Sequence, residues 1–132
     1  HDGIIGSIAK KREIEARDFY IFGKYAFLHG DRDFKEVWER RVTSWIVGHG
    51  HPAVKLSDGT KIESYKCFLV GKYDGREVII APSFIEYFAG SDPRERDYEM
   101  GFAWKFNLEK FRVLVVGETD LEARDFGLLG EL

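Results

Sequence analysis

The stretch that decides the fold is TSWIVGHGHP, residues 43–52. Its first half, residues 43–47, contains the apolar run Trp45 to Val47, and the glycines, histidines and proline that follow interrupt this run. The pattern predicts a short buried strand that leads directly into a glycine-rich turn. Loops at strand ends are where α/β folds place ligand-binding groups, because the sheet holds the loop rigidly. We therefore expect His49 and His51 to belong to a functional site.

Further strands are predicted on both sides of this stretch. Residues 19–22 and 25–28 are aromatic-rich and flank Gly23-Lys24, which predicts a β-hairpin that ends just before His29. Tight turns and the strands beside them follow downstream. The turns are expected at Asp58-Gly59 and Asp74-Gly75, and the strands over residues 61–70, 77–81 and 113–116.

Two helices and one loop complete the expected elements. Residues 7–17 suit a short surface helix, and Asp33 with Glu36 resembles a capping box that opens a helix through residue 41. The charged segment 92–99 (DPRERDYE) predicts an exposed loop. Short strands with a few helices predict one α/β layered domain.

The composition excludes several classes of protein. The chain has 132 residues, of which 44% are apolar and 33% charged, so it can form an ordinary core and is not disordered. No apolar run approaches the roughly 18–20 residues of a membrane span. The net charge of −3 gives no support to a non-specific nucleic-acid binder. The single cysteine, Cys67, is expected in the core, and its solitude favours a reducing, cytoplasmic location.

Four histidines, all within the first 51 residues, are the candidate functional groups. His49 and His51 stand two residues apart, so in an extended turn their side chains diverge and suit two neighbouring metal ions. Asp31 is the nearby acid. Imidazole suits Zn, Fe, Mn or Ni, and added carboxylates favour Mn. A structural role for His29 alone remains open at this point.

Three ordered motifs resemble those of calcineurin-like metallophosphoesterases. His1-Asp2 resembles the end of the Gly-Asn-His-Asp motif, Leu28-His29-Gly30-Asp31 the single-histidine motif, and Gly48-His49-Gly50-His51 the Gly-His-x-His motif. Residues 46–71 and 78–84 resemble a prokaryotic subgroup of predicted phosphoesterases, which includes proteins encoded beside DNA ligase. The first two motifs of the superfamily, Asp-x-His and Gly-Asp-x-x-Asp, are absent from the chain.

The resemblance implies a fold, an activity and a role for each histidine. Residues 1–132 would be the C-terminal half of a four-layer αββα sandwich with mixed sheets. The implied activity is metal-dependent hydrolysis of a phosphomonoester or phosphodiester by a metal-activated hydroxide. His29 and His49 would bind one of two divalent ions and His51 the other. His1 would be the general acid, held by Asp2.

The resemblance leaves the substrate open, and nucleotides and nucleic acids are among the candidates. A second hypothesis is a non-catalytic metal-binding or interaction fragment that needs a partner chain. The resemblance also implies that the upstream half of the domain is missing. We therefore expect the chain alone to bind metal poorly, to lack appreciable activity and to leave apolar groups exposed beside His29 and His49. The runs 19–28 and 43–47 are the expected uncovered faces.

Overall fold

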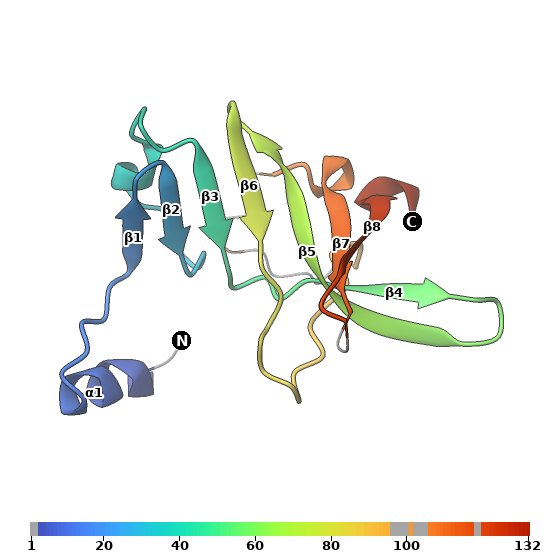
Figure 1. The fold of residues 1–132 in the computed structure, drawn as a ribbon, viewed down its shortest axis with the longest axis horizontal. Helices are drawn as coiled ribbons and strands as arrows, with labels where there is room; N and C mark the ends of the chain where they lie inside the picture. Colours follow the sequence, from blue (N-terminus) through green and yellow to red (C-terminus); the bar gives the residue numbers. More distant parts are fainter. Residues whose placement is uncertain (1–2, 96–100, 102–105, 118–119) are drawn as a thin grey trace.

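Strands joined in one mixed sheet dominate the computed structural model, which describes residues 3–95, 101, 106–117 and 120–132 (Figure 1). The strands are β1 (Phe19–Phe22), β2 (Tyr25–Leu28), β3 (Ser44–Val47), β4 (Ala53–Ser57), β5 (Ile62–Tyr73), β6 (Arg76–Ile80), β7 (Arg112–Val116) and β8 (Ala123–Leu128). The helices are α1 (Gly3–Lys11) and the 3-10 helices η1 (Lys35–Trp38), η3 (Leu108–Lys110) and η4 (Leu129–Glu131). Few helices and a mixed sheet agree with the expected α/β class.

Three parallel strands at the centre of the sheet position the candidate site. The strand order is β1-β2-β3-β6-β5-β7-β8, and β4 pairs with β5 outside this path. β2, β3 and β6 run parallel, whereas the other pairs are antiparallel. Leu28 is in register with Val47, and Val47 with Ile80. The chain therefore leaves all three strands at the same edge of the sheet.

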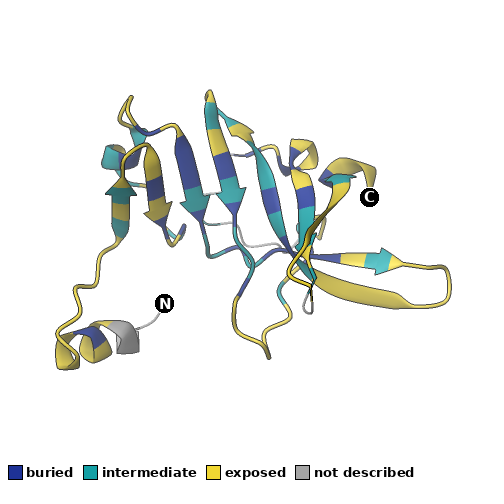
Figure 2. Cartoon of the chain, in the orientation of Figure 1, coloured by how far each residue is buried: buried dark blue, intermediate teal, exposed yellow. Residues whose placement is uncertain are grey.

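The core lies on one face of these central strands, because the buried residues Trp45 and Val47 of β3 alternate along the strand and are in register with the buried Val78 and Ile80 of β6. Figure 2 shows that both strands carry buried residues. Trp45 is completely buried, and its indole nitrogen donates a hydrogen bond of 2.9 Å to the carbonyl of Val37. Phe106 stacks on Trp45 with ring centroids 6.2 Å apart. Cys67 is buried as predicted, and burial is the main cause that raises the pKa of its thiol to about 12. This core fixes the strands that carry the histidines.

The opposite face of the β1–β2 hairpin is open to solvent. Tyr20 pairs with Phe27 across the hairpin and Phe22 pairs with Tyr25, and all four aromatic side chains are exposed. Together these four residues are called the aromatic face. The expected exposure is thus confirmed for residues 19–28. It is wrong for residues 43–47, because the four residues of β3 in this run are buried or half-buried.

The two expected helices differ from those observed. α1 begins before residue 7 and ends at Lys11, so residues 12–17 are not helical. The helix expected over residues 33–41 is reduced to η1, and Phe34 rather than Asp33 precedes it. Asp33 accepts a hydrogen bond of 2.7 Å from the Trp38 indole nitrogen instead of capping the backbone. The side chain that was expected to cap the helix is therefore engaged elsewhere.

The segment expected as an exposed loop, residues 92–99, begins with a buried anchor. Asp92 is only 4% exposed and accepts hydrogen bonds from the Arg94 side chain and from the backbone N–H of Lys55. Residues 96–99 lie outside the described part of the chain. The β8 strand was not expected from the sequence. Among the described residues, no helix has both the length and the apolar character that a bilayer crossing requires.

Candidate functional site

Two histidines from adjacent parallel strands meet at the edge of the sheet. His29 directly follows β2, and His49 comes two residues after the end of β3. His29 Nε2 and His49 Nδ1 lie 3.2 Å apart, and the two rings stand at 80° with centroids 5.0 Å apart. The parallel register of β2 and β3 brings them together, because it ends both strands at the same level. We call this arrangement the histidine pair.

The loop that carries His49 has an unusual backbone. His49 and His51 have φ angles of +65° and +44°, in the left-handed region that side chains other than glycine rarely adopt. Between them, the Gly50 N–H donates a hydrogen bond of 2.8 Å to the Gly48 carbonyl. Such conformations cost free energy and persist only where the surrounding structure enforces them, which is common at functional sites.

Close packing of two glycines keeps the histidine pair in place. Gly30 has a φ angle of +106°, and a Cβ atom there would lie 2.6 Å from Val47 Cγ1. Gly101 packs against the same loops, because a Cβ atom at this position would lie 2.6 Å from His49 Cδ2. Both loops can therefore approach each other only because these positions lack side chains.

His51 has a different environment from the histidine pair. Its ring packs edge-to-face on Phe88, with centroids 5.1 Å apart. Partial burial lowers the pKa of His51, and the nearby His49 and Lys66 lower it further. The neutral imidazole is therefore favoured, and this is the form that binds metals.

The segment around Ser91 is hydrogen-bonded to the backbone on both sides of Pro52, at His51 and Ala53. The Ser91 N–H donates a hydrogen bond of 3.1 Å to the His51 carbonyl, and the Ala53 N–H donates one of 2.9 Å to the Ser91 carbonyl. Burial alone would raise the pKa of Asp92, but hydrogen bonds from the Arg94 side chain and from the backbone of Lys55 and Arg94 outweigh it and lower the pKa to about 2. Asp92 is thus an ionised anchor for this segment.

The spacing of the histidine pair fits two ligands of one metal ion. Two nitrogens that each bind one ion at about 2.1 Å lie about 3.0 Å apart at a right angle and about 3.4 Å apart at the tetrahedral angle. The observed 3.2 Å falls between these values. A direct hydrogen bond between the rings fits the same distance. Among the described residues, no group of three or more His, Cys, Asp or Glu side chains is placed to hold a metal ion.

Of the other sequence-predicted residues, two lie outside the described part of the chain and one is engaged by an arginine. His1 and Asp2, the expected general acid and its partner, are outside the described residues. Asp31 accepts a hydrogen bond of 3.2 Å from Arg32 Nε. Sequence reasoning missed Gly101 and Ser91, because their contacts with the two histidine loops arise only from tertiary packing. The glycine at position 30 could have indicated the positive φ angle from the sequence, because glycine adopts such angles without steric cost.

A shallow groove of about 340 Å³ opens beside His29. It extends from the ends of β2 and β3 across Phe27 to the start of β1. Its lining includes His29, Phe27, Tyr20, Arg17 and Asp18. The groove therefore connects His29 of the histidine pair with half of the aromatic face.

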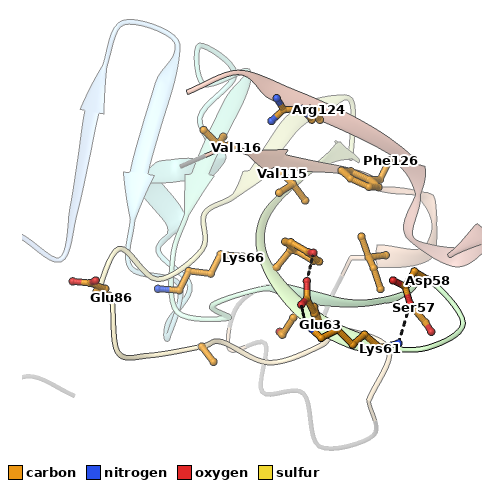
Figure 3. Close-up of a pocket in the computed structure, with 15 residues that line it drawn as sticks. Ser57, Asp58, Lys61, Glu63, Lys66, Glu86, Val115, Val116, Arg124 and Phe126 are labelled. Atoms are coloured by element: carbon orange, nitrogen blue, oxygen red, sulfur yellow. Dashed lines mark hydrogen bonds and ion pairs between the residues drawn. The ribbon is translucent and has the colours of Figure 1, made fainter. Parts of the chain in front are cut away.

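A larger groove of about 1060 Å³ lies away from the histidine pair, between the β4–β5 hairpin, β7–β8 and the loop before Gly90 (Figure 3). Two of its cations have carboxylate partners, because Lys61 pairs with Glu63 and Arg124 with Asp120. Lys66 donates to the carbonyl of Ile85. Among the described residues, its lining contains no histidine. We regard the smaller groove as the candidate site, because it lies at the ends of parallel strands, where α/β folds bind ligands. This position carries more weight than the larger volume of the other groove.

The comparisons with known proteins leave the family open. No protein-family model, curated protein or solved structure matches the chain. The geometry of the site is therefore the basis for its function.

Proposed function

We propose that the chain carries part of the active site of a metal-dependent phosphoesterase, in which the histidine pair holds one divalent metal ion. The observation that supports this proposal is the 3.2 Å separation of His29 Nε2 and His49 Nδ1, at the carboxyl ends of two parallel strands. Two imidazoles are a suitable donor set for Mn, Fe, Zn or Ni. His51 would contribute to a second ion, as the resemblance of the Gly48-His49-Gly50-His51 motif implies.

The residues have distinct roles in this proposal. Bound divalent ions supply Lewis-acid stabilisation of the phosphoryl oxygens. His29 and His49 would each supply one ring nitrogen to the ion, and the packing of Gly30 and Gly101 holds the two loops that carry these nitrogens 3.2 Å apart. The roles of His1 as proton donor to the leaving oxygen and of Asp2 as its partner remain part of the proposal. The four-layer sandwich with a second sheet also remains part of the proposal.

Paramagnetic NMR tests the metal site directly. Mn²⁺ added to the labelled chain should broaden the amide signals of residues 29–30 and 48–50 before other signals. His29→Ala and His49→Ala should each abolish this selective broadening, whereas the matched variant His51→Ala should retain it at residues 29–30. Unchanged broadening in His49→Ala, or first broadening at a site remote from these residues, would contradict the proposal.

Hydrolysis by the full-length protein tests the activity. A phosphomonoester, a phosphodiester and single-stranded DNA are compared in the presence of Mn²⁺ and in the presence of EDTA. At least one should be hydrolysed, and both EDTA and His49→Ala should remove that hydrolysis. If none of the three is hydrolysed in an EDTA-sensitive way, the proposed activity is wrong.

The exposed aromatic face favours a second candidate function, a non-catalytic module that docks a partner chain. Exposed apolar surface of this kind is typical of interaction sites. The two candidates differ in the effect of His49→Ala, which removes hydrolysis in the first and leaves partner binding intact in the second.

A further inference from the structure

The small groove beside the histidine pair combines three kinds of side chain in one place. Its lining includes His29, which follows β2, the aromatic residues Phe27 and Tyr20, and the charged residues Arg17 and Asp18, which precede β1. Phe27 and Tyr20 are cross-strand partners, so their side chains project from the same face of the hairpin. They are 43% and 48% exposed. About half of each side chain is thus available to a ligand.

The groove has the dimensions of a small-molecule site. Its volume of about 340 Å³ lies at the lower end of the range of about 300–1,000 Å³ that is typical of ligand pockets. This volume suits a single small ligand better than a folded segment of a partner. The rings of Phe27 and Tyr20 in the lining offer a stacking surface, and aromatic rings stack on nucleobases with little dependence on sequence.

The polar end of the groove complements the edge of a base. The Arg17 guanidinium lies over the Tyr20 ring, 5.4 Å from its centroid, and also pairs with Glu15. Asp18 accepts a hydrogen bond of 3.0 Å from Arg32, and a carboxylate can also accept from an exocyclic amino group. Arginine and aspartate together offer both donors and acceptors.

We propose that this groove binds the base of a nucleotide, with Phe27 and Tyr20 as the stacking surface and the phosphate directed toward the histidine pair. The proposal rests on the proposed phosphoesterase function, and it narrows the substrate to a nucleotide phosphoester. The continuity of the groove with His29 is the reason to prefer a nucleotide over a protein partner at this position.

Binding of three related probes to the chain tests the proposal. Adenosine 5′-monophosphate contains base and phosphate, adenosine lacks the phosphate, and ribose 5-phosphate lacks the base. Titrations followed by amide NMR should show that adenosine and its monophosphate shift the signals of Tyr20 and Phe27. Ribose 5-phosphate should shift the signals near His29 and His49 only.

Variants distinguish a base site from a generally adhesive surface. Phe27→Ala should weaken binding of adenosine 5′-monophosphate about 5- to 150-fold, the range that loss of one stacked base gives, and should leave ribose 5-phosphate unaffected. Phe27→Tyr should restore the affinity. Phe22→Ala is the matched control, because Phe22 is an exposed aromatic residue of the same hairpin outside the groove.

The outcomes separate the two proposals. Adenosine binding that depends on Phe27, without hydrolysis by the full-length protein, would support the base site and contradict the phosphoesterase. Equal losses for Phe22→Ala and Phe27→Ala would overturn the base site. Self-association of the chain that either variant relieves, without binding of adenosine, would also overturn it and identify the aromatic face as a protein interface.

Discussion

Substitution of Gly30 by alanine tests whether close packing holds the two histidine loops together. Gly30 has a φ angle of +106°, where a Cβ atom is strained, and this atom would lie 2.6 Å from Val47 Cγ1 and 3.2 Å from the Gly48 carbonyl oxygen. The backbone conformation should cost about 1–3 kcal/mol. The collision with a buried strand should cost about 1–3 kcal/mol more, because overpacking forces neighbours to move.

Gly59→Ala provides the matched control for the backbone contribution. Gly59 has a comparable φ angle of +92°, but a Cβ atom there would meet no atom within 4 Å. Urea unfolding of both variants and of the unmodified chain gives the free energies of unfolding. We expect Gly30→Ala to be less stable than Gly59→Ala by about 1–3 kcal/mol, the contribution of the collision alone.

The same variant should also disturb the histidine pair, because the strand and loop that must yield carry His49. In Gly30→Ala, broadening by Mn²⁺ of the amide signals of residues 29–30 and 48–50 should weaken, and in Gly59→Ala it should persist. Equal free energies of unfolding for the two variants, together with unchanged broadening, would refute the view that the approach of these loops at Gly30 supports the site.

Two further predictions concern the buried groups that support the site. The pKa of Asp92 is about 2 in the fold, below the value of about 3.9 in unfolded chains, so its charge should stabilise the protein by about 2 kcal/mol above pH 4 and lose this effect as the pH falls toward 2. Asp92→Asn should therefore be less stable at pH 7 and approach the unmodified chain at pH 2.5 in urea titrations; a difference independent of pH would contradict the charged anchor. Cys67, with a pKa of about 12, should react with a thiol reagent at pH 8 about 1000-fold more slowly in the fold than in urea. Comparable rates in both conditions would show that the thiol is not buried.

The sequence predicted elements whose signals are local. The hairpin of β1 and β2 occurs where it was expected, because Gly23 supplies the turn and aromatic residues flank it on both sides. The helix after Asp33 was wrong, because the Trp38 indole competes for the carboxylate that would have capped it. β8 was missed, because most of its side chains are exposed and give no apolar alternation.

The candidate site depends on packing that no local pattern contains. The sequence placed His29 and His49 at the ends of apolar runs, but their separation of 3.2 Å requires β2 and β3 to pair in parallel and in register. Likewise, the contact of Gly101 with the His49 ring joins positions 52 residues apart in sequence. Long-range pairing of this kind determines which of several plausible histidines become neighbours.

The backbone of His49 bears on whether the histidine pair is only a structural hydrogen bond. A hydrogen bond of this kind contributes about 0.5–1.5 kcal/mol, whereas a left-handed residue other than glycine costs about 1–2 kcal/mol, and the loop contains two of them. The hydrogen bond alone therefore does not offset the strain, and strained backbone of this kind clusters at active sites and ligand sites. This argument predicts that His49→Gly is more stable than His49→Ala by about 1 kcal/mol, the reverse of their usual order, because glycine relieves the positive φ. Both variants should lose the Mn²⁺ effect at residues 29–30. If the alanine variant is the more stable in urea unfolding, the loop is not strained at His49 and this argument for a ligand site fails.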